Sequence, residues 1–319
     1  MEAERLSQIL NKHGYAIKTE IGHGTFAKCY LCDSEKYNSP FVCKVIRISP
    51  EIAKKGYETT FYSELNALIK LMHPNVINIY DHFCEEEYYV LVLEYCSGGN
   101  LLQYIEKWGP IEPYKIIILA RQILECLTYV HSNNICHHDI KPSNIFIDAF
   151  NRVKLADFGI SQILQKNEMS IMYGGSIAYL APEVFQKLPY DSFKADIWSF
   201  GVTLYQMITG GNLPYCGNNI MELLHSIFQE KYILPKNCPK ELRMLLKNSL
   251  NPNPEKRWTA KQLRDYLQSV QNSTPISTPR RITRTSSLRE KSFSQCESPY
   301  SMPSLVRPVI YRKVKKITL

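Results

Sequence analysis

The sequence predicts an α+β protein with two lobes, because strand and helix signals occupy different parts of the chain. Strand-like patterns dominate residues 15–95 and are interrupted by one helical pattern near residues 57–72. Helical periodicity of apolar residues dominates from residue 101 onward. We therefore expect a small antiparallel β-sheet lobe with one helix, followed by a larger and mainly helical lobe.

The composition is that of an ordinary globular chain. A length of 319 residues with 45% hydrophobic residues suffices for two lobes with their own cores. No run approaches the roughly 18 apolar residues of a membrane span, and the acidic start lacks the apolar core of a signal peptide. The ten cysteines are spread singly, which favours a reducing compartment. We expect a cytoplasmic protein with nuclear access possible, and we interpret Cys29 and Cys32 as strand residues rather than metal ligands.

Charge is concentrated at the C-terminal end. From Gln271 onward there are ten Lys/Arg and two acids, so this segment alone accounts for the chain's net charge of +8. It is also rich in Ser, Thr and Pro, a composition typical of disorder. The basic residues of 312–316 make it a candidate to bind acidic protein, lipid or nucleic-acid surfaces. The alternative, which we favour, is a solvated tail that is phosphorylated.

A glycine-containing hairpin opens the strand region. Residues 21–30 read IGHGTFAKCY, which predicts two strands with Gly22 and Gly24 at the turn. Glycines allow the backbone to approach phosphates closely and to present N–H groups to them. The pattern alone is weak, because dinucleotide-binding folds use similar letters. However, residues 28–32 continue as a strand and no helix begins after Ala27, so a phosphate-binding hairpin is the better interpretation.

A lysine interrupts the next apolar strand, which reads FVCKVI over residues 41–46. A charge in an apolar strand costs free energy unless it is paired. We expect Glu64, twenty residues after Lys44 in a helical pattern, to be its partner. The alternative is that Lys44 is a surface residue on an edge strand. Residues 89–96 then predict a buried strand that ends in the linker 97–100.

Helices are expected after this linker, at positions where apolar residues recur with helical spacing. The expected ranges are 101–107, 113–132, 191–210, 219–230, 239–250 and 259–270.

The most informative stretch is 136–159, which reads CHHDIKPSNIFIDAFNRVKLADFG. Asp139, Lys141 and Asn144 fall within six residues, and Asp157 follows eighteen residues after Asp139. These groups suit phosphoryl transfer: one carboxylate orients the attacking hydroxyl, the lysine neutralises charge, and the amide with the second carboxylate holds Mg²⁺. The bland alternative is a loop with scattered polar residues.

The order of these groups resembles the catalytic and metal loops of eukaryotic protein kinases, H-R-D-L-K-P-x-N followed by D-F-G, with His138 at the arginine position. The hairpin is similar to the kinase glycine-rich loop, with Ala27 at the third glycine, and the strand of Lys44 resembles V-A-I-K. Residues 175–183 resemble the end of the activation segment. The resemblance covers about residues 15–268 and is nearest to the calcium/calmodulin-dependent and AMP-activated kinase group.

The resemblance implies a protein kinase fold with an N-lobe at 15–95 and a C-lobe at 96–268, preceded by an extension (1–14) and followed by the tail (269–319). It implies that ATP and Mg²⁺ bind between the lobes and that protein substrates are phosphorylated. Catalytic roles fall to Asp139, Lys141, Lys44 and Glu64, and metal ligation falls to Asn144 and Asp157. The nucleotide contacts would be Ile21, Gly22, His23, Gly24, Thr25, Phe26, Ala27, Lys28, Cys29, Val42, Lys44, Leu93, Glu94, Cys96 and Phe146.

The resemblance also implies three supporting contacts. Asp196 should anchor the backbone of the catalytic loop, and Arg257 should pair with Glu183. An apolar stack that aligns the lobes should consist of Leu68, Ile79, His137 and Phe158.

Lys141 and Ser176 fit the serine/threonine type, but two departures from the nearest group affect specificity and control. Asn100 and Ser143 stand where relatives often carry acids that bind a substrate arginine, so we expect weak selectivity for arginine three residues before the target. His138 also replaces the arginine that clasps an activation-loop phosphate.

Met172 occupies the usual phosphoacceptor position, so both halves of that switch are missing. We expect an activity that needs no activation-loop phosphorylation, with Ser170 and Tyr173 left as alternative acceptors. A catalytically weak or inactive kinase-fold scaffold is the other function considered; it is disfavoured because Lys44, Asp139 and the metal ligands all stand.

Overall fold

The computed structural model describes residues 2–23, 27–34, 36–48, 57–165, 168–170, 172, 174–186 and 188–273. The chain divides into one unit of Met1–Pro275 and a second of Ile276–Leu319, and the second lies outside the described residues. The expectations for Gly24, Thr25, Phe26 and Tyr173, and for the tail beyond residue 273, therefore also lie outside them.

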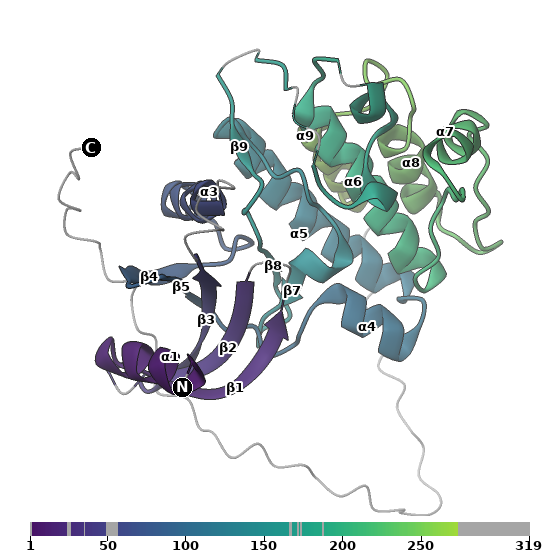
Figure 1. The fold of residues 1–319 in the computed structure, drawn as a ribbon. Coiled ribbons are helices and arrows are strands. Elements are labelled where there is room, and N and C mark those ends of the chain that lie inside the picture. Colours follow the sequence, from purple (N-terminus) through teal and green to yellow (C-terminus); the bar gives the residue numbers. More distant parts are fainter. Residues whose placement is uncertain are drawn as a thin grey trace, which may run out of the picture. The chain divides into compact units, whose positions relative to one another are not determined.

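Five antiparallel strands form the sheet of the first lobe, in the order β1-β2-β3-β5-β4. Figure 1 shows this sheet, purple to blue, beside the helices of the second lobe, which run from blue (α4 and α5) to yellow-green. The strands are β1 (Tyr15–His23), β2 (Ala27–Ser34), β3 (Ser39–Arg47), β4 (Ile79–Glu85) and β5 (Tyr88–Glu94). The expected antiparallel sheet and the expected helix within it, α3 (Tyr57–Lys70), are confirmed.

Strand alternation gives the sheet two apolar faces, because successive side chains of a strand point to opposite sides. On β3, Phe41, Cys43 and Val45 belong to one buried cluster, whereas Ile46 belongs to the other, with Val42 packed against it. The second face carries α3, whose Phe61, Leu65 and Leu68 belong to the same cluster as Ile46. Lys44 lies on this second face, so its side chain is directed toward α3.

The opposite face is covered by α1 (Glu2–Lys12), for which the sequence reasoning assigned no structure. Leu6, Ile9 and Leu10 recur at helical spacing and are buried against the sheet. Arg5 pairs with Glu86, and Lys12 lies 2.7 Å from Glu85, both at the end of β4. The N-terminal segment therefore completes a core of the first lobe.

The second lobe contains helices close to the expected ranges. They are α4 (Leu101–Trp108), α5 (Pro113–Ser132), α6 (Ser192–Thr209), α7 (Ile220–Phe228), α8 (Lys240–Ser249) and α9 (Ala260–Ser273). Asn100, Asp191 and Asn219 cap α4, α6 and α7 through their side chains. Gly210 ends α6 in a left-handed conformation, where a Cβ would lie 2.7 Å from Pro110. α9 continues into the segment that we assigned to the tail.

Two short strand pairs hold the loops of the expected active site. β6 (Ile135–Cys136) pairs with β9 (Gln162–Ile163), and β7 (Ile145–Ile147) pairs with β8 (Val153–Leu155). The catalytic loop runs from β6 to β7 and includes the 3₁₀ helix η1 (Pro142–Asn144). The metal loop runs from β8 to β9. Sequence patterns could not reveal these strands, because two or three residues are too few to establish a period of two.

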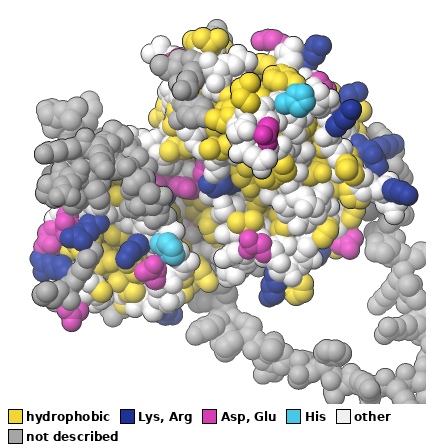
Figure 2. Space-filling view, turned by 45° about the vertical axis from the view of Figure 1, so that its right-hand side comes forward, with side chains coloured by type: hydrophobic (Ala, Val, Ile, Leu, Met, Phe, Trp, Pro, Cys, Tyr) yellow, Lys and Arg dark blue, Asp and Glu magenta, His cyan; other side chains and the backbone are white. Residues whose placement is uncertain are grey.

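The surface is mixed in charge. Figure 2 shows Lys/Arg and Asp/Glu side chains on both lobes of the face in view, with apolar side chains between them. Among the helices that the structure describes, none combines the length and apolarity that a membrane span requires.

Candidate active site

Lys44 lies between two carboxylates that come from different parts of the fold. Its Nζ is 2.6 Å from Oε2 of Glu64 on α3 and 2.8 Å from Oδ1 of Asp157 after β8. Burial alone would lower the pKa of Lys44, but the two carboxylates outweigh it and raise the pKa. β3 lies between β2 and β5, so the alternative of a surface lysine on an edge strand is wrong and the expected Lys44–Glu64 pair is present.

The catalytic loop presents Asp139 inside a hydrogen-bonded cluster. Its Oδ2 accepts from Nζ of Lys141 at 2.6 Å and from Nδ2 of Asn144 at 2.9 Å. Its Oδ1 accepts from the hydroxyl of Ser176 at 3.1 Å. Lys141 Nζ also donates to the Ser176 hydroxyl at 2.8 Å. These bonds fix the carboxylate against Ser176, which belongs to residues 175–183, the expected end of the activation segment.

Asp196, on α6, anchors the backbone of this loop, as expected. Its two carboxylate oxygens accept the N–H groups of His137 and His138 at 2.9 and 2.8 Å, and His131 Nε2 lies 3.0 Å away. Burial opposes ionisation of Asp196, but its hydrogen bonds and the neighbouring histidines lower the pKa below its ordinary value. His138 itself has a φ of +66°, a conformation that this anchor stabilises.

The oxygen donors of Asp157 and Asn144 fit a Mg²⁺ ion. Asn144 uses its amide nitrogen toward Asp139, which leaves the carbonyl oxygen as the ligand atom. Asp157 uses Oδ1 toward Lys44, and the Lys44 ammonium lowers its pKa, so the carboxylate is ionised at neutral pH. The described residues contain no group of three or more His, Cys, Asp or Glu side chains with metal-site geometry. The two oxygen donors of Asn144 and Asp157 fit Mg²⁺, which takes one or two protein ligands and completes its shell with phosphate and water oxygens.

The expected nucleotide residues line the sheet and the linker. Gly22 and His23 on β1 pair with Cys29 and Lys28 on β2, on either side of the turn. Cys29 is also the Cα partner of Lys44, and burial raises the pKa of its thiol to about 11. Cys29 and Cys32 lie three residues apart on one strand and so point to opposite faces, which supports their interpretation as strand residues.

Glu94 holds the linker through its side chain. Its Oε2 accepts from Nζ of Lys154 on β8 at 2.8 Å and from Nδ2 of Asn78 at 2.8 Å. Lys154 is only 2% exposed. The sequence reasoning missed Lys154, although the signal that identified Lys44, a charge inside an apolar strand, was present there too. The Glu94 N–H donates to the Asn78 carbonyl at 2.9 Å and the Cys96 carbonyl accepts the N–H of Gly99 at 3.2 Å, so the expected contacts with a planar ligand fall to the Glu94 carbonyl and the Cys96 N–H.

Apolar and buried contacts around the catalytic and metal loops hold these loops in place. His137 and Phe158 stack edge to face with ring centroids 4.6 Å apart, and Leu68 belongs to the same core with Ile79 packed against it. Arg257 binds Glu183 through two bonds of 2.6 and 3.0 Å, as expected. Phe146 on β7 is packed against this core and forms a β-bridge with Asn100 of the linker.

The structure shows the surroundings of the residues that depart from the nearest kinase group, which are Asn100, Ser143 and His138. The side chain of Asn100 accepts the N–H of Gln103 at 2.9 Å and caps α4, and Ser143 lies inside η1. His138 is 8% exposed, and burial lowers its pKa, so the ring is neutral at pH 7. Ser170 is 1% exposed, an environment that does not suit a phosphoacceptor.

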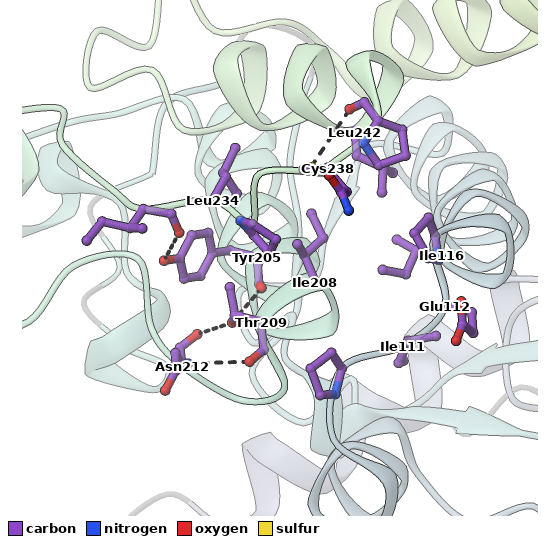
Figure 3. Close-up of a pocket in the computed structure, with 16 residues that line it drawn as sticks. Ile111, Glu112, Ile116, Tyr205, Ile208, Thr209, Asn212, Leu234, Cys238 and Leu242 are labelled. Atoms are coloured by element: carbon purple, nitrogen blue, oxygen red, sulfur yellow. Dashed lines mark hydrogen bonds between the residues drawn. The ribbon is translucent and has the colours of Figure 1, made fainter.

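A separate apolar groove of about 730 Å³ lies on the helical lobe. Figure 3 shows its lining, contributed by the α4–α5 connection (Ile111, Glu112), the end of α6 (Ile208, Thr209) and the residues before α8 (Cys238). None of the catalytic, metal or nucleotide residues lines it. The groove is thus separate from the candidate active site, which lies at the junction between the sheet and the catalytic loop.

Comparison with known proteins agrees with this geometry. Residues 15–267 match the protein kinase domain family. The chain is 33% identical over 258 residues to a probable serine/threonine-protein kinase of Dictyostelium discoideum, covering 81% of this chain and 31% of that protein. It is 32% identical over 248 residues to CBL-interacting serine/threonine-protein kinase 12 of Arabidopsis thaliana, covering 77% and 50% of the two chains.

A probable cell cycle serine/threonine-protein kinase, the CDC5 homolog of Encephalitozoon cuniculi, is 34% identical over 253 residues, covering 78% of this chain and 53% of that protein. The chain thus spans between about a third and a half of the length of these relatives. Together with the site geometry, the match over most of its length shows that this chain belongs to the protein kinase family and has the two-lobed kinase fold.

Proposed function

We propose that this chain is an active serine/threonine protein kinase that transfers the γ-phosphoryl group of ATP to protein hydroxyls. The observation that carries the proposal is the Asp139 carboxylate, which is held by Lys141, Asn144 and Ser176. The intact Lys44–Glu64 pair supports it. A scaffold that only binds partners would not need to hold both of these charged groups, at Asp139 and at Lys44, in a fixed arrangement.

The roles of the residues follow from their positions. Asp139 orients the acceptor hydroxyl and takes its proton, while Lys141 neutralises charge that develops on the transferred group. Lys44, fixed by Glu64, positions the phosphates. Mg²⁺, when bound with ATP, supplies charge neutralisation between the phosphates, and Asn144 and Asp157 would hold it. The Ser176 hydroxyl lies between Asp139 and Lys141. The space beside the Asp139 carboxylate therefore favours a small aliphatic hydroxyl, such as that of a substrate serine or threonine.

Control without activation-loop phosphorylation is the second part of the proposal. The motive is that His138 is neutral and buried and that Met172 cannot accept a phosphate. The third part is weak selectivity for arginine three residues before the target, because Asn100 and Ser143 carry no charge. We further propose a cytoplasmic location, with the basic tail as a solvated, phosphorylatable segment rather than a dedicated binding surface.

The test is turnover of Mg²⁺–ATP with a serine-containing protein substrate, comparing the full chain with Asp139→Asn. We expect turnover to fall by about 10²- to 10⁴-fold, since a general base and its charge are lost. Nucleotide affinity should stay unchanged, because Asp139 does not contact the nucleotide. A wild-type chain that binds Mg²⁺–ATP but shows no turnover above Asp139→Asn would instead identify a scaffold.

A further inference from the structure

Ser170 is a buried hydroxyl in the middle of the activation segment. It is 1% exposed, and its Oγ donates to Oε1 of Gln162 at 2.9 Å while accepting the N–H of Met172 at 3.0 Å. Its backbone exchanges two hydrogen bonds of 2.9 Å with Tyr190, one in each direction. A serine on an irregular segment is thus bonded through its N–H, its carbonyl and both functions of its hydroxyl.

Tyr190 connects this serine to the start of α6. Its hydroxyl donates to the carbonyl of Met172 at 2.7 Å, so Met172 is held through both of its backbone groups. Tyr190 is 6% exposed and directly precedes Asp191, which caps α6. This end of the activation segment is therefore tied to a helix that is buried along nearly its whole length.

Gln162 connects the serine to the catalytic loop. It lies on β9, where it is the partner of Cys136 on β6, three residues before Asp139. Its side chain also opposes the lowering of the His138 pKa, which places the two residues close together. Ser170, Gln162, Tyr190 and Met172 form what we call the Ser170 cluster, and its contacts reach both α6 and the catalytic loop.

The other end of the same segment is fixed directly at Asp139. The N–H and hydroxyl of Ser176 both donate to Oδ1 of Asp139, at 3.3 and 3.1 Å. Gly175, with a φ of +100°, packs so closely on the His138 carbonyl that a Cβ would lie 2.6 Å from it. Residues 172–176 therefore span two fixed points, the Ser170 cluster and Asp139.

We propose that Ser170 is a positioning residue for phosphoryl transfer. The Ser170 cluster holds the activation segment in the geometry that brings Ser176 to Asp139, and it does so with neutral hydrogen bonds in place of a phosphate. The inference rests on the proposed kinase activity. A corollary follows for modification. The described partners of Ser170, which are Gln162, Tyr190 and the Met172 backbone, carry no positive charge, so none of them could compensate a phosphate on Ser170, and the phosphate would inhibit rather than activate.

The test compares Ser170→Ala, Ser170→Asp and Gln162→Ala in the full chain. We expect Ser170→Ala to lower kcat/KM for a protein substrate by about tenfold, because Gln162 and the Met172 backbone both lose a hydrogen bond to the buried serine. The affinity for Mg²⁺–ATP should not change. Ser170→Asp should lower kcat/KM at least as much. Because Ser170 and Gln162 act through one bond, Ser170→Ala combined with Gln162→Ala should cost clearly less than the product of the single effects.

Ser132→Ala is the matched control, since Ser132 is exposed and its hydroxyl donates 2.7 Å to a backbone carbonyl outside the cluster. Hydrogen–deuterium exchange gives a second readout that needs no activity. In Ser170→Ala, amides of residues 170–176 should exchange faster than in wild type and in Ser132→Ala, even if the wild type were inactive.

Two results would overturn the proposal. One is unchanged exchange in residues 170–176 together with at least half of the wild-type kcat/KM in Ser170→Ala. The other is a Ser170→Asp variant more active than wild type, which would make Ser170 an activating phosphosite. An inactive wild type with faster exchange in Ser170→Ala would reject the kinase activity but would support the role of the Ser170 cluster in holding the activation segment.

Discussion

The residues proposed for phosphoryl transfer and the Ser170 cluster both consist of buried or partly buried polar groups, but only the first set is charged. Lys44, Glu64 and Asp157 form ion pairs of 2.6 and 2.8 Å. The Ser170 cluster has bonds of similar length, 2.7 to 3.0 Å, between neutral groups. The Ser170 cluster thus holds its segment without charge, whereas the first set balances charge against charge.

The difference has an energetic basis. A buried ion requires compensation for its desolvation, so losing one partner of an ion pair is costly. A neutral hydrogen bond contributes less and costs less when it is lost. We therefore expect the charged clusters to break severely under single substitutions and the neutral cluster to respond in a graded way. The following predictions test that contrast.

The largest effect is expected from Arg257→Leu. The guanidinium is 1% exposed and binds Glu183 through two bonds. Its loss leaves a buried carboxylate without a partner, which should lower the free energy of unfolding by about 3–5 kcal/mol. Chemical denaturation measures this. Arg264→Leu, which removes a solvent-exposed pair with Asp265, should change stability by less than about 1 kcal/mol. Equal effects of the two variants would contradict the contrast.

Lys44→Met should come next and should act on catalysis. Removing the cation that Glu64 and Asp157 share should lower kcat/KM for ATP by about 10²- to 10³-fold, the usual cost of losing one electrostatic stabiliser. Lys18→Met is the control, because it removes an exposed lysine paired with Asp33 in the same sheet. Steady-state kinetics against ATP concentration measure both. A Lys44→Met variant with wild-type efficiency would show that the lysine does not contact phosphates.

A pH dependence of stability is expected from His138. Burial lowers its pKa, Asp196 opposes that shift, and His137 and His131 add to it. The folded state therefore binds the proton less readily than the unfolded state, whose pKa is about 6.5. Stability from the neutral ring is present above that pH and is lost as the pH falls through the lower, folded-state value.

The measurement is the unfolding free energy of wild type and His138→Gln between pH 7.5 and about 5. The wild type should lose more stability on acidification than the variant, because the variant has no proton to bind at this position. His225→Gln, at an exposed histidine on α7, is the control and should follow the wild-type curve. Parallel curves for wild type and His138→Gln would show that the ring does not titrate in this range.

The smallest effect is expected in substrate selection. A peptide library should show less than tenfold enrichment of arginine three residues before the target, or less than about 1.4 kcal/mol. The double variant Asn100→Asp and Ser143→Glu should raise that enrichment, since it restores charge. Asp is also a good N-cap, so the helix start at α4 should survive the change. Strong enrichment in the wild type would reject our account of these two positions.

Sequence patterns revealed Lys44, Glu64, the catalytic loop and the helices because each carries a local signal. A charge inside an apolar strand needs a partner, and helical spacing of apolar residues spans enough positions to be recognised. The same reasoning should have found Lys154, which is also a charge in an apolar strand. It could not have found Gln162 or Tyr190, because their roles come only from contacts across 8 and 18 or more residues with Ser170 and Met172.

The sequence by itself predicted the two-lobed architecture and the groups that we propose for phosphoryl transfer, since period and spacing act over a few residues. Only the tertiary structure decided how the activation segment is held. Ser170 looks like any polar residue of an irregular stretch, and its role arises where β9, the segment itself and the start of α6 come together. Tertiary contacts also decided the place of α1, whose apolar residues complete a face of a sheet formed by later strands.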